Sequence, residues 1–187
     1  MPNWCSNNIT ITGPAQKIRA LYEAATAEDG GLLNAMVPMP CELGNTVKGS
    51  GDELQIEQYD GFTNWYDWCV ARWGTKWDVN PEGLEFVDGE NGTAELTGYF
   101  DSAWAPPVEA YKTFEEQNPD CSVEASYYEM GCDFAGFYSN GDDEYMEGLR
   151  EEYDLPEDER SNLFKRLDEE FGLSDQFAEY DEFDEED

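Results

Sequence analysis

Apolar and polar residues alternate along several short stretches of the chain, and turn-forming residues close each stretch. Residues 8–12 alternate in this way and end at Gly13-Pro14. That pattern is typical of a half-buried strand that runs into the start of a helix. The helix expected over residues 14–28 has one apolar face, formed by Ile18, Leu21, Tyr22 and Ala25.

A tight hairpin is the clearest feature in the middle of the chain. Two strands are expected over residues 84–87 and 93–100, because Asp88-Gly89 and Asn91-Gly92 between them favour a tight turn. Helices are expected over residues 64–73 and 108–117, and further strands over 122–128 and 134–138, the last as an edge strand. The order strand, helix, hairpin, helix, strand favours an α+β class, a ferredoxin-like antiparallel sheet with helices on one face.

Charge divides the chain more sharply than hydropathy does. The 187 residues carry 44 acidic and 10 basic side chains, a formal net charge of −34. Residues 1–141 hold 23 acids and 6 bases, whereas residues 142–187 hold 21 acids and 4 bases. The change falls beside the turn-forming pair Asn140-Gly141. We therefore expect a ferredoxin-like α+β domain over residues 1–141 and an acidic helical C-terminal segment over residues 142–187.

The C-terminal segment has an apolar stripe of its own. A helix whose first turn accepts Pro156 carries Leu163, Phe164, Leu167 and Phe171 and ends at Gly172. Ser174 is expected to cap a further short helix that carries Phe177, Tyr180 and Phe183. Such a stripe must be buried against the body of the chain, against a partner, or against a second copy in a homodimer.

The residue types exclude most catalytic chemistry. The chain has no histidine, so Ser-His and Cys-His pairs are impossible and the commonest transition-metal ligand is missing. No phosphate-binding GxxxxGK[ST] sequence is present. Asp142, Asp143 and Glu144 lack the alternating spacing of a calcium loop. We expect no enzymatic activity, no cofactor and no specific metal site.

Cysteine usage and hydropathy indicate a cytoplasmic protein. The five cysteines are odd in number and widely spaced, and no CxxC pair occurs, as is typical of thiols that stay reduced. No stretch approaches the roughly 18 apolar residues that cross a bilayer. We therefore expect no membrane association.

The tryptophans offer two interpretations. All six lie in the body of the chain, and five of them, Trp65, Trp68, Trp73, Trp77 and Trp104, lie close together in the sequence or within the motifs described below. They either fill the interface between sheet and helices or line a pocket for a peptide or an uncharged or cationic small molecule. Stacking on the bases of a single strand is disfavoured, because it requires a basic groove and Arg72 and Lys76 stand among acids.

Four separated motifs resemble a known family. They are Met-Pro-Asn-Trp-Cys-Ser-Asn at residues 1–7, Pro-Met-Pro at 38–40, Trp-Gly-Thr-Lys-Trp-Asp at 73–78 and Ser-Ala-Trp-Ala-Pro-Pro at 102–107. In this order they resemble the YubB ferredoxin-like family of conjugative plasmids and bacteriophages. The resemblance implies a ferredoxin-like fold and a mobile genetic element active in a bacterial host cytoplasm. It implies no catalytic activity and no functional residues, and we do not associate the segment after Gly141 with the family.

The acidic C-terminal segment points to a basic partner. An anionic surface repels nucleic acid and acidic membranes and attracts proteins that hold DNA. If residues 142–187 formed one continuous helix, a net charge would occur about every 4 Å, against roughly 1.7 Å in duplex DNA. We predict a nucleic-acid mimic that binds no nucleic acid itself and inhibits a basic DNA-binding host protein of a defence pathway, such as restriction or CRISPR. In the alternative, the tryptophan-rich body binds a small molecule or peptide and the acid serves solubility or salt adaptation.

The predicted contact surface consists of carboxylates with aromatic anchors between them. The carboxylates are those of Asp142, Asp143, Glu144, Glu147, Glu151, Glu152, Asp154, Glu157, Asp158, Glu159, Asp168, Glu169 and Glu170. The anchors are Tyr145, Tyr153 and Phe164.

Overall fold

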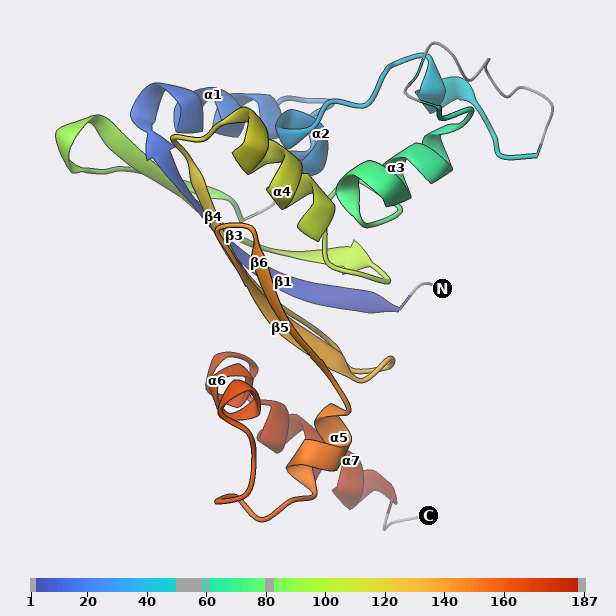
Figure 1. The fold of residues 1–187 in the computed structure, drawn as a ribbon, viewed down its shortest axis with the longest axis vertical. Helices are drawn as coiled ribbons and strands as arrows, with labels where there is room; N and C mark the ends of the chain where they lie inside the picture. Colours follow the sequence, from blue (N-terminus) through green and yellow to red (C-terminus); the bar gives the residue numbers. More distant parts are fainter. Residues whose placement is uncertain (1–2, 50–58, 60, 80–82, 185–187) are drawn as a thin grey trace.

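The computed structural model describes residues 3–49, 59, 61–79 and 83–184. Within these ranges the chain forms one antiparallel sheet in the order β2-β3-β1-β4-β5-β6, with helices on both faces (Figure 1). The strands are β1 (Trp4–Pro14), β2 (Glu85–Asp88), β3 (Thr93–Ala103), β4 (Ser122–Glu129), β5 (Phe134–Ser139) and β6 (Asp142–Glu147). The helices are α1 (Ala15–Ala25), α2 (Leu32–Met36), α3 (Trp65–Trp73), α4 (Val108–Gln117), α5 (Leu149–Tyr153), α6 (Asn162–Phe171) and α7 (Leu173–Asp184). Short 3-10 turns occur at Leu43–Asn45 and Glu90–Gly92.

The predicted ferredoxin-like α+β fold is confirmed, and β1 forms its centre. Ile9 of β1 lies opposite Gly98 of β3 on one side and Ala125 of β4 on the other. Because side chains alternate along a strand, Ile9 and Ile11 are buried beneath the helices while Thr10 faces the opposite side. The expected hairpin is also present, as β2 and β3 pair with Phe86 opposite Leu96.

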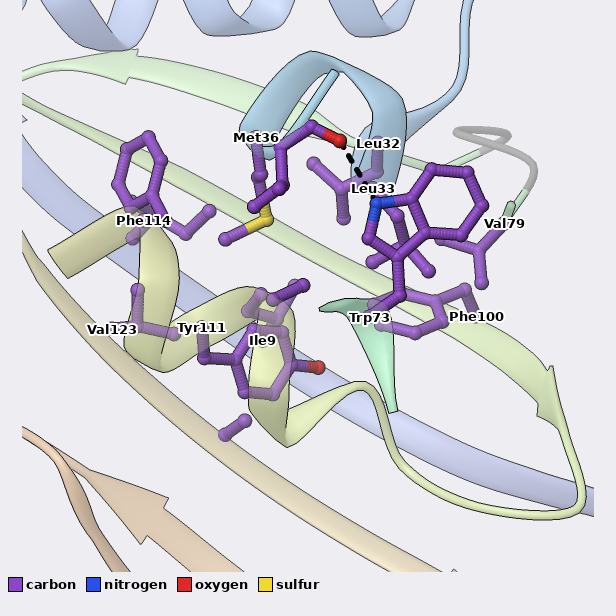
Figure 2. Close-up of a cluster of buried hydrophobic side chains, with 14 of the residues drawn as sticks. Ile9, Leu32, Leu33, Met36, Trp73, Val79, Phe100, Tyr111, Phe114 and Val123 are labelled. Atoms are coloured by element: carbon purple, nitrogen blue, oxygen red, sulfur yellow. Dashed lines mark hydrogen bonds between the residues drawn. The ribbon is translucent and has the colours of Figure 1, made fainter. Parts of the chain in front are cut away.

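The larger core lies between the sheet and helices α1–α4. Figure 2 shows Trp73 packed there near Leu33, with its indole N–H donating a hydrogen bond of 2.9 Å to the backbone carbonyl of Val37. Trp68 is also buried and meets Trp73 edge to face. These two tryptophans therefore fill the interface between sheet and helices. Of the two interpretations of the tryptophans, packing between sheet and helices therefore holds for Trp68 and Trp73.

A second, smaller core lies on the opposite face, where α5, α6 and α7 cover β4 and β5 (Figure 1). Its buried residues are Ala135, Leu149, Phe164, Leu167, Leu173 and Phe177. The chain's own sheet thus covers the C-terminal apolar stripe. Of the three surfaces that could bury this stripe (the body of the chain, a partner or a second copy), the structure shows the body. Tyr180 of the second stripe is exposed, and the side chain of Phe183 lies outside the described part of the chain.

The structure around Gly141 differs from the one expected. Strand β5 is not the edge, because Asp142–Glu147 forms β6 and pairs with it in register from Ser139↔Asp142 to Phe134↔Glu147. The segment is therefore a strand followed by three helices, and the spacing worked out for one continuous helix does not apply. The boundary placed at residue 141 falls inside the β5–β6 hairpin turn.

Candidate acidic interaction surface

The acidic layer, defined here as β6 with α5, α6 and α7, begins at a turn that the sequence encodes. Asn140 and Gly141 both have positive φ, 50° and 84°, as the two central residues of a type I′ hairpin turn require. The turn directs β6 back along β5. Asp143, Tyr145 and Glu147 then lie on the sheet face that carries α4, and Asp142, Glu144 and Met146 lie on the face that carries α6. Carboxylates therefore border both faces of this sheet edge.

Asp143 is held by a tyrosine of β4 whose side chain reaches across β5. The Tyr127 hydroxyl donates a hydrogen bond of 2.6 Å to Asp143 Oδ1. The phenol ring passes over Gly136, where a Cβ would lie only 2.6 Å from Tyr127 Cζ and 2.9 Å from the carbonyl oxygen of Glu144. Burial, helped by the bond to Asp143, raises the pKa of Tyr127 well above its ordinary value. The phenol therefore stays protonated and remains a donor to the carboxylate.

Tyr145 is the exposed aromatic residue of this edge. Its side chain is 47% exposed, and its hydroxyl donates a 2.8 Å hydrogen bond to Glu147 Oε1. Its ring lies 5.8 Å from that of Phe134. Partial burial and the bond to Glu147 raise the pKa of Tyr145 to about 12. The ring is thus fixed in orientation while much of its surface meets solvent.

Two predicted carboxylates fix α6 onto the sheet. Arg166 of α6 pairs with Glu144 of β6 at 2.6 Å and stacks over the Phe137 ring at 4.5 Å. Glu170 Oε1 accepts hydrogen bonds from Asn8 Nδ2 at 2.8 Å and from Ser126 Oγ at 3.1 Å. These contacts join residues far apart in the chain, so no local pattern in the sequence predicts them.

Two further carboxylates cap helices inside the layer. Asp168 accepts hydrogen bonds of 2.6 Å from both the backbone N–H and the hydroxyl of Ser174. Glu152 accepts a 2.8 Å bond from the backbone N–H of Ser161, which itself caps α6. Ser174 was expected to cap the last helix. Instead, it lies inside the first turn of α7, and Asp168 caps its backbone N–H. The start of α6 is likewise at Ser161 rather than near Pro156.

Three arginines of the layer bind other residues of the chain. Arg150 pairs with Asp154 at 3.2 Å and Asp181 at 2.8 Å and lies over the rings of Tyr153 and Phe177. Arg160 donates to the backbone carbonyls of Tyr153 and Leu155. With Arg166 paired to Glu144, three of the four basic residues after Gly141 bind within the chain. Their charges stabilise the layer and neutralise few of its outer carboxylates.

The predicted contact carboxylates therefore divide into those that bind within the chain and those that face solvent. The second group, exposed and outside the side-chain bonds described above, consists of Asp142, Glu151, Glu157, Asp158, Glu159 and Glu169. Two of the three predicted aromatic anchors are wrong. Phe164 is 0% exposed, and Tyr153 is half-buried with its ring 5.1 Å from that of Phe177. Both are needed to bury the apolar stripe, so only Tyr145 remains available for contact.

A second exposed feature lies outside the acidic layer, around Lys76. The Lys76 ammonium lies 4.2 Å from the Trp77 ring centroid and 4.9 Å from that of Trp104. The Trp4 ring lies 6.2 Å from Trp77, and all three indoles are between 39% and 50% exposed. Trp104 adopts φ 71°, and its backbone N–H donates to the carbonyl of Asn3.

This indole cluster, Trp4 with Trp77 and Trp104, differs from the predicted tryptophan pocket. Trp68 lies in the core and Trp65 packs against Tyr66, so these residues do not meet Trp77 and Trp104 around one cavity. Trp4 was missed as a functional candidate, although it stands in the first family-like motif. A non-glycine residue with positive φ is a useful structural signal for such a surface, but the sequence does not reveal it.

The described residues contain no group of three or more potential metal ligands of the His, Cys, Asp and Glu types. All five cysteines are unpaired, and burial raises the pKa of the Cys69 thiol to about 12. Among the same residues, no helix combines the length and apolar character needed to cross a membrane.

Comparison with known proteins identifies the class as a ferredoxin-like domain. Residues 71–180 match the family described as the ferredoxin-like domain in Api92-like protein, so the chain belongs to that family. The crystal structure of protein Api92 from Yersinia pseudotuberculosis is similar at 12% identity and a TM-score of 0.44, over 79% of this chain and 98% of that one. No curated protein matches. The family match reaches residue 180 and so includes most of the segment after Gly141, which the resemblance of the four motifs had left uncovered.

Proposed function

We propose that this protein is a non-catalytic nucleic-acid mimic that inhibits a basic DNA-binding host protein. The observation that carries the proposal is the packing of the acidic layer, since its carboxylates stand on elements that a buried core and paired arginines hold in place. A fixed array of carboxylates presents a defined pattern to Arg and Lys side chains, which a flexible acidic tail does not.

The resemblance of four motifs to the YubB family supports the biological setting of the proposal. It supports an origin on a plasmid or bacteriophage and a partner in the bacterial host cytoplasm, where proteins of defence pathways bind DNA. The mimic would itself bind neither nucleic acid nor acidic membranes, because its net charge of −34 repels both. Its complex with the partner should weaken as salt is added.

Competition tests this proposal directly. Host proteins retained on the immobilised protein at low salt and released at high salt would be purified, and each would be bound to a labelled DNA duplex. We expect the wild-type protein to displace the duplex at low salt. If every retained DNA-binding protein keeps its duplex with this protein in excess, mimicry is refuted.

Two triple variants separate the acidic layer from net charge alone. The first neutralises Glu157, Asp158 and Glu159, which are exposed between α5 and α6. The second neutralises Glu23, Glu28 and Asp29, which are exposed on and after α1, across the sheet. Both remove three charges, but only the first should weaken displacement. Equal effects of the two variants would indicate that bulk charge is responsible and not the acidic layer.

A second candidate function is peptide or small-molecule binding by the indole cluster. The observation in its favour is the exposure of three tryptophans around one lysine, with Trp104 held at positive φ. Strained backbone at an exposed aromatic residue often marks a functional surface. If a ligand from a peptide or metabolite library quenches tryptophan fluorescence in the wild type and in Trp68→Phe, but not in a Trp77→Ala/Trp104→Ala variant, this second function gains support. A library without any such ligand counts against it.

A further inference from the structure

We propose that the free edge of β6 binds an extended, basic segment of the partner, which adds to the sheet as a further strand. This inference rests on the proposed function, because it assumes a basic partner, and it specifies the form in which that partner binds. The described sheet ends at β6, which pairs only with β5. Its outer backbone groups are therefore available to another strand.

The register shows which backbone groups of β6 are available. The residues that close a two-residue hairpin exchange both backbone hydrogen bonds, which assigns Ser139 and Asp142 to a bonded pair. Six residues further along, the N–H of Gly148 donates to the carbonyl of Asp133 at 2.9 Å, which agrees with this alternation.

It follows that Asp142, Glu144 and Met146 direct their backbone groups to β5. Asp143, Tyr145 and Glu147 direct theirs away from the sheet. These three residues present the N–H and C=O groups that an added strand would bind.

The side chains along this edge select a basic strand. Asp143 and Glu147 lie on one face on either side of Tyr145, and each carboxylate is oriented by a tyrosine hydroxyl. Asp142 lies on the other face and is exposed. A strand with Lys or Arg at facing positions would form cross-strand ion pairs here, whereas acidic residues at those positions would repel.

Other occupants fit this edge less well. A second copy of β6 would bring its own carboxylates against these, and charged edges are a known means of preventing such self-pairing. Duplex DNA is anionic and is repelled. The opposite edge, β2, has four residues, and Arg19 forms an ion pair with its Asp88. The β6 edge is thus the more suitable one for a basic segment.

A peptide pair tests strand addition without changing the protein. The probe is an eight-residue peptide that alternates lysine with valine or threonine, and the control has the same sequence with N-methyl groups on alternate backbone amides. The charges are identical, but the control cannot donate along one edge. We expect the control to bind about tenfold more weakly at low salt, because several backbone hydrogen bonds are lost.

Hydrogen exchange of individual amides provides the second readout. The probe peptide should slow exchange at Asp143, Tyr145 and Glu147 and leave exchange at Asp142 and Glu144 unchanged, because the latter amides already face β5. Equal binding of the two peptides, or protection without this alternation, would overturn strand addition. A failure to bind either peptide would overturn it as well. Protection of the same amides without peptide, together with a dimer on size-exclusion chromatography, would overturn it in favour of a second copy.

The two proposals can fail separately. Salt-sensitive binding of both peptides with equal affinity refutes strand addition, while displacement of DNA from a host protein by the acidic layer can still be observed. Conversely, if no retained host protein loses its duplex, mimicry fails whatever the peptides do.

Discussion

Replacement of Phe164 by alanine tests whether the acidic layer is a packed part of the fold. The side chain is 0% exposed and lies in the smaller core with Leu149, Leu167 and Leu173. A buried phenylalanine removes roughly 150 Å² or more of apolar surface from water, which corresponds to about 4 kcal/mol at about 25 cal/mol per Å². Truncations of this kind cost about 3–5 kcal/mol. We therefore expect the free energy of unfolding to fall by about 3–5 kcal/mol.

The assay is urea unfolding followed by circular dichroism, with hydrogen exchange to locate the change. Tyr180→Ala is a suitable control, because it removes an aromatic ring of the same layer that is 58% exposed. The control should change the free energy of unfolding by about 0.5 kcal/mol or less. A loss below about 1 kcal/mol for Phe164→Ala would refute the view that the layer is docked on the sheet. A large loss confined to amides of α5–α7 would show that this layer unfolds as a separate unit.

Four further predictions concern single residues and the net charge. Asp168→Ala should cost about 0.5–2 kcal/mol of unfolding free energy in urea, because the backbone N–H and hydroxyl of Ser174 lose their acceptor. In a pH titration followed by tyrosine absorbance, Tyr145→Phe should remove a step near pH 12. The pKa of Tyr145 is raised in the folded state, so the hydroxyl contributes to stability below about pH 10, and this contribution is lost as pH rises toward 12. Trp104→Gly should be more stable to urea than Trp104→Ala by about 1 kcal/mol, the reverse of the usual order, because the backbone has φ 71°. Added sodium chloride should raise the melting temperature by screening repulsion among the carboxylates, and a constant or falling value would contradict this.

Much of the fold could be predicted because its signals are local. The alternation in residues 8–12 lies within β1, and the Asp-Gly and Asn-Gly pairs mark the β2–β3 hairpin. The apolar spacing in residues 163–171 corresponds to the buried face of α6. In each case a short pattern matches the period of the element, and no distant residue is needed to specify it.

The elements that were missed depend on contacts with distant residues. Strand β6 reads Asp-Asp-Glu-Tyr-Met-Glu, and acidic residues are poor strand formers, so only its pairing with β5 makes it a strand. The Asn140-Gly141 signal was recognised as a turn, but not as the turn that joins β5 and β6 in a hairpin. Helix α2 has five residues, and its first backbone N–H groups bind the carboxylate of Asp78, 45 residues away from Leu33 in the chain.

The candidate site was only partly visible in the sequence for the same reason. Composition drew attention to the carboxylates after Gly141, but it did not distinguish Glu170 and Asp168, which bind within the chain, from Glu157 and Glu159, which face solvent. A sequence pattern also cannot separate a buried Phe164 from an exposed Tyr145 when both lie in acidic surroundings. That distinction follows from the tertiary packing of α6 against the sheet.

The contacts of the three arginines have an evolutionary consequence. Arg150, Arg160 and Arg166 each join parts of the fold, so replacing any of them would loosen the helices as well as alter the charge. None of the contacts described above involves the outer carboxylates at residues 157–159. If the proposed function holds, these acids can vary with the surface of a changing partner while the arginines stay constant, so a new binding pattern would not require a new fold.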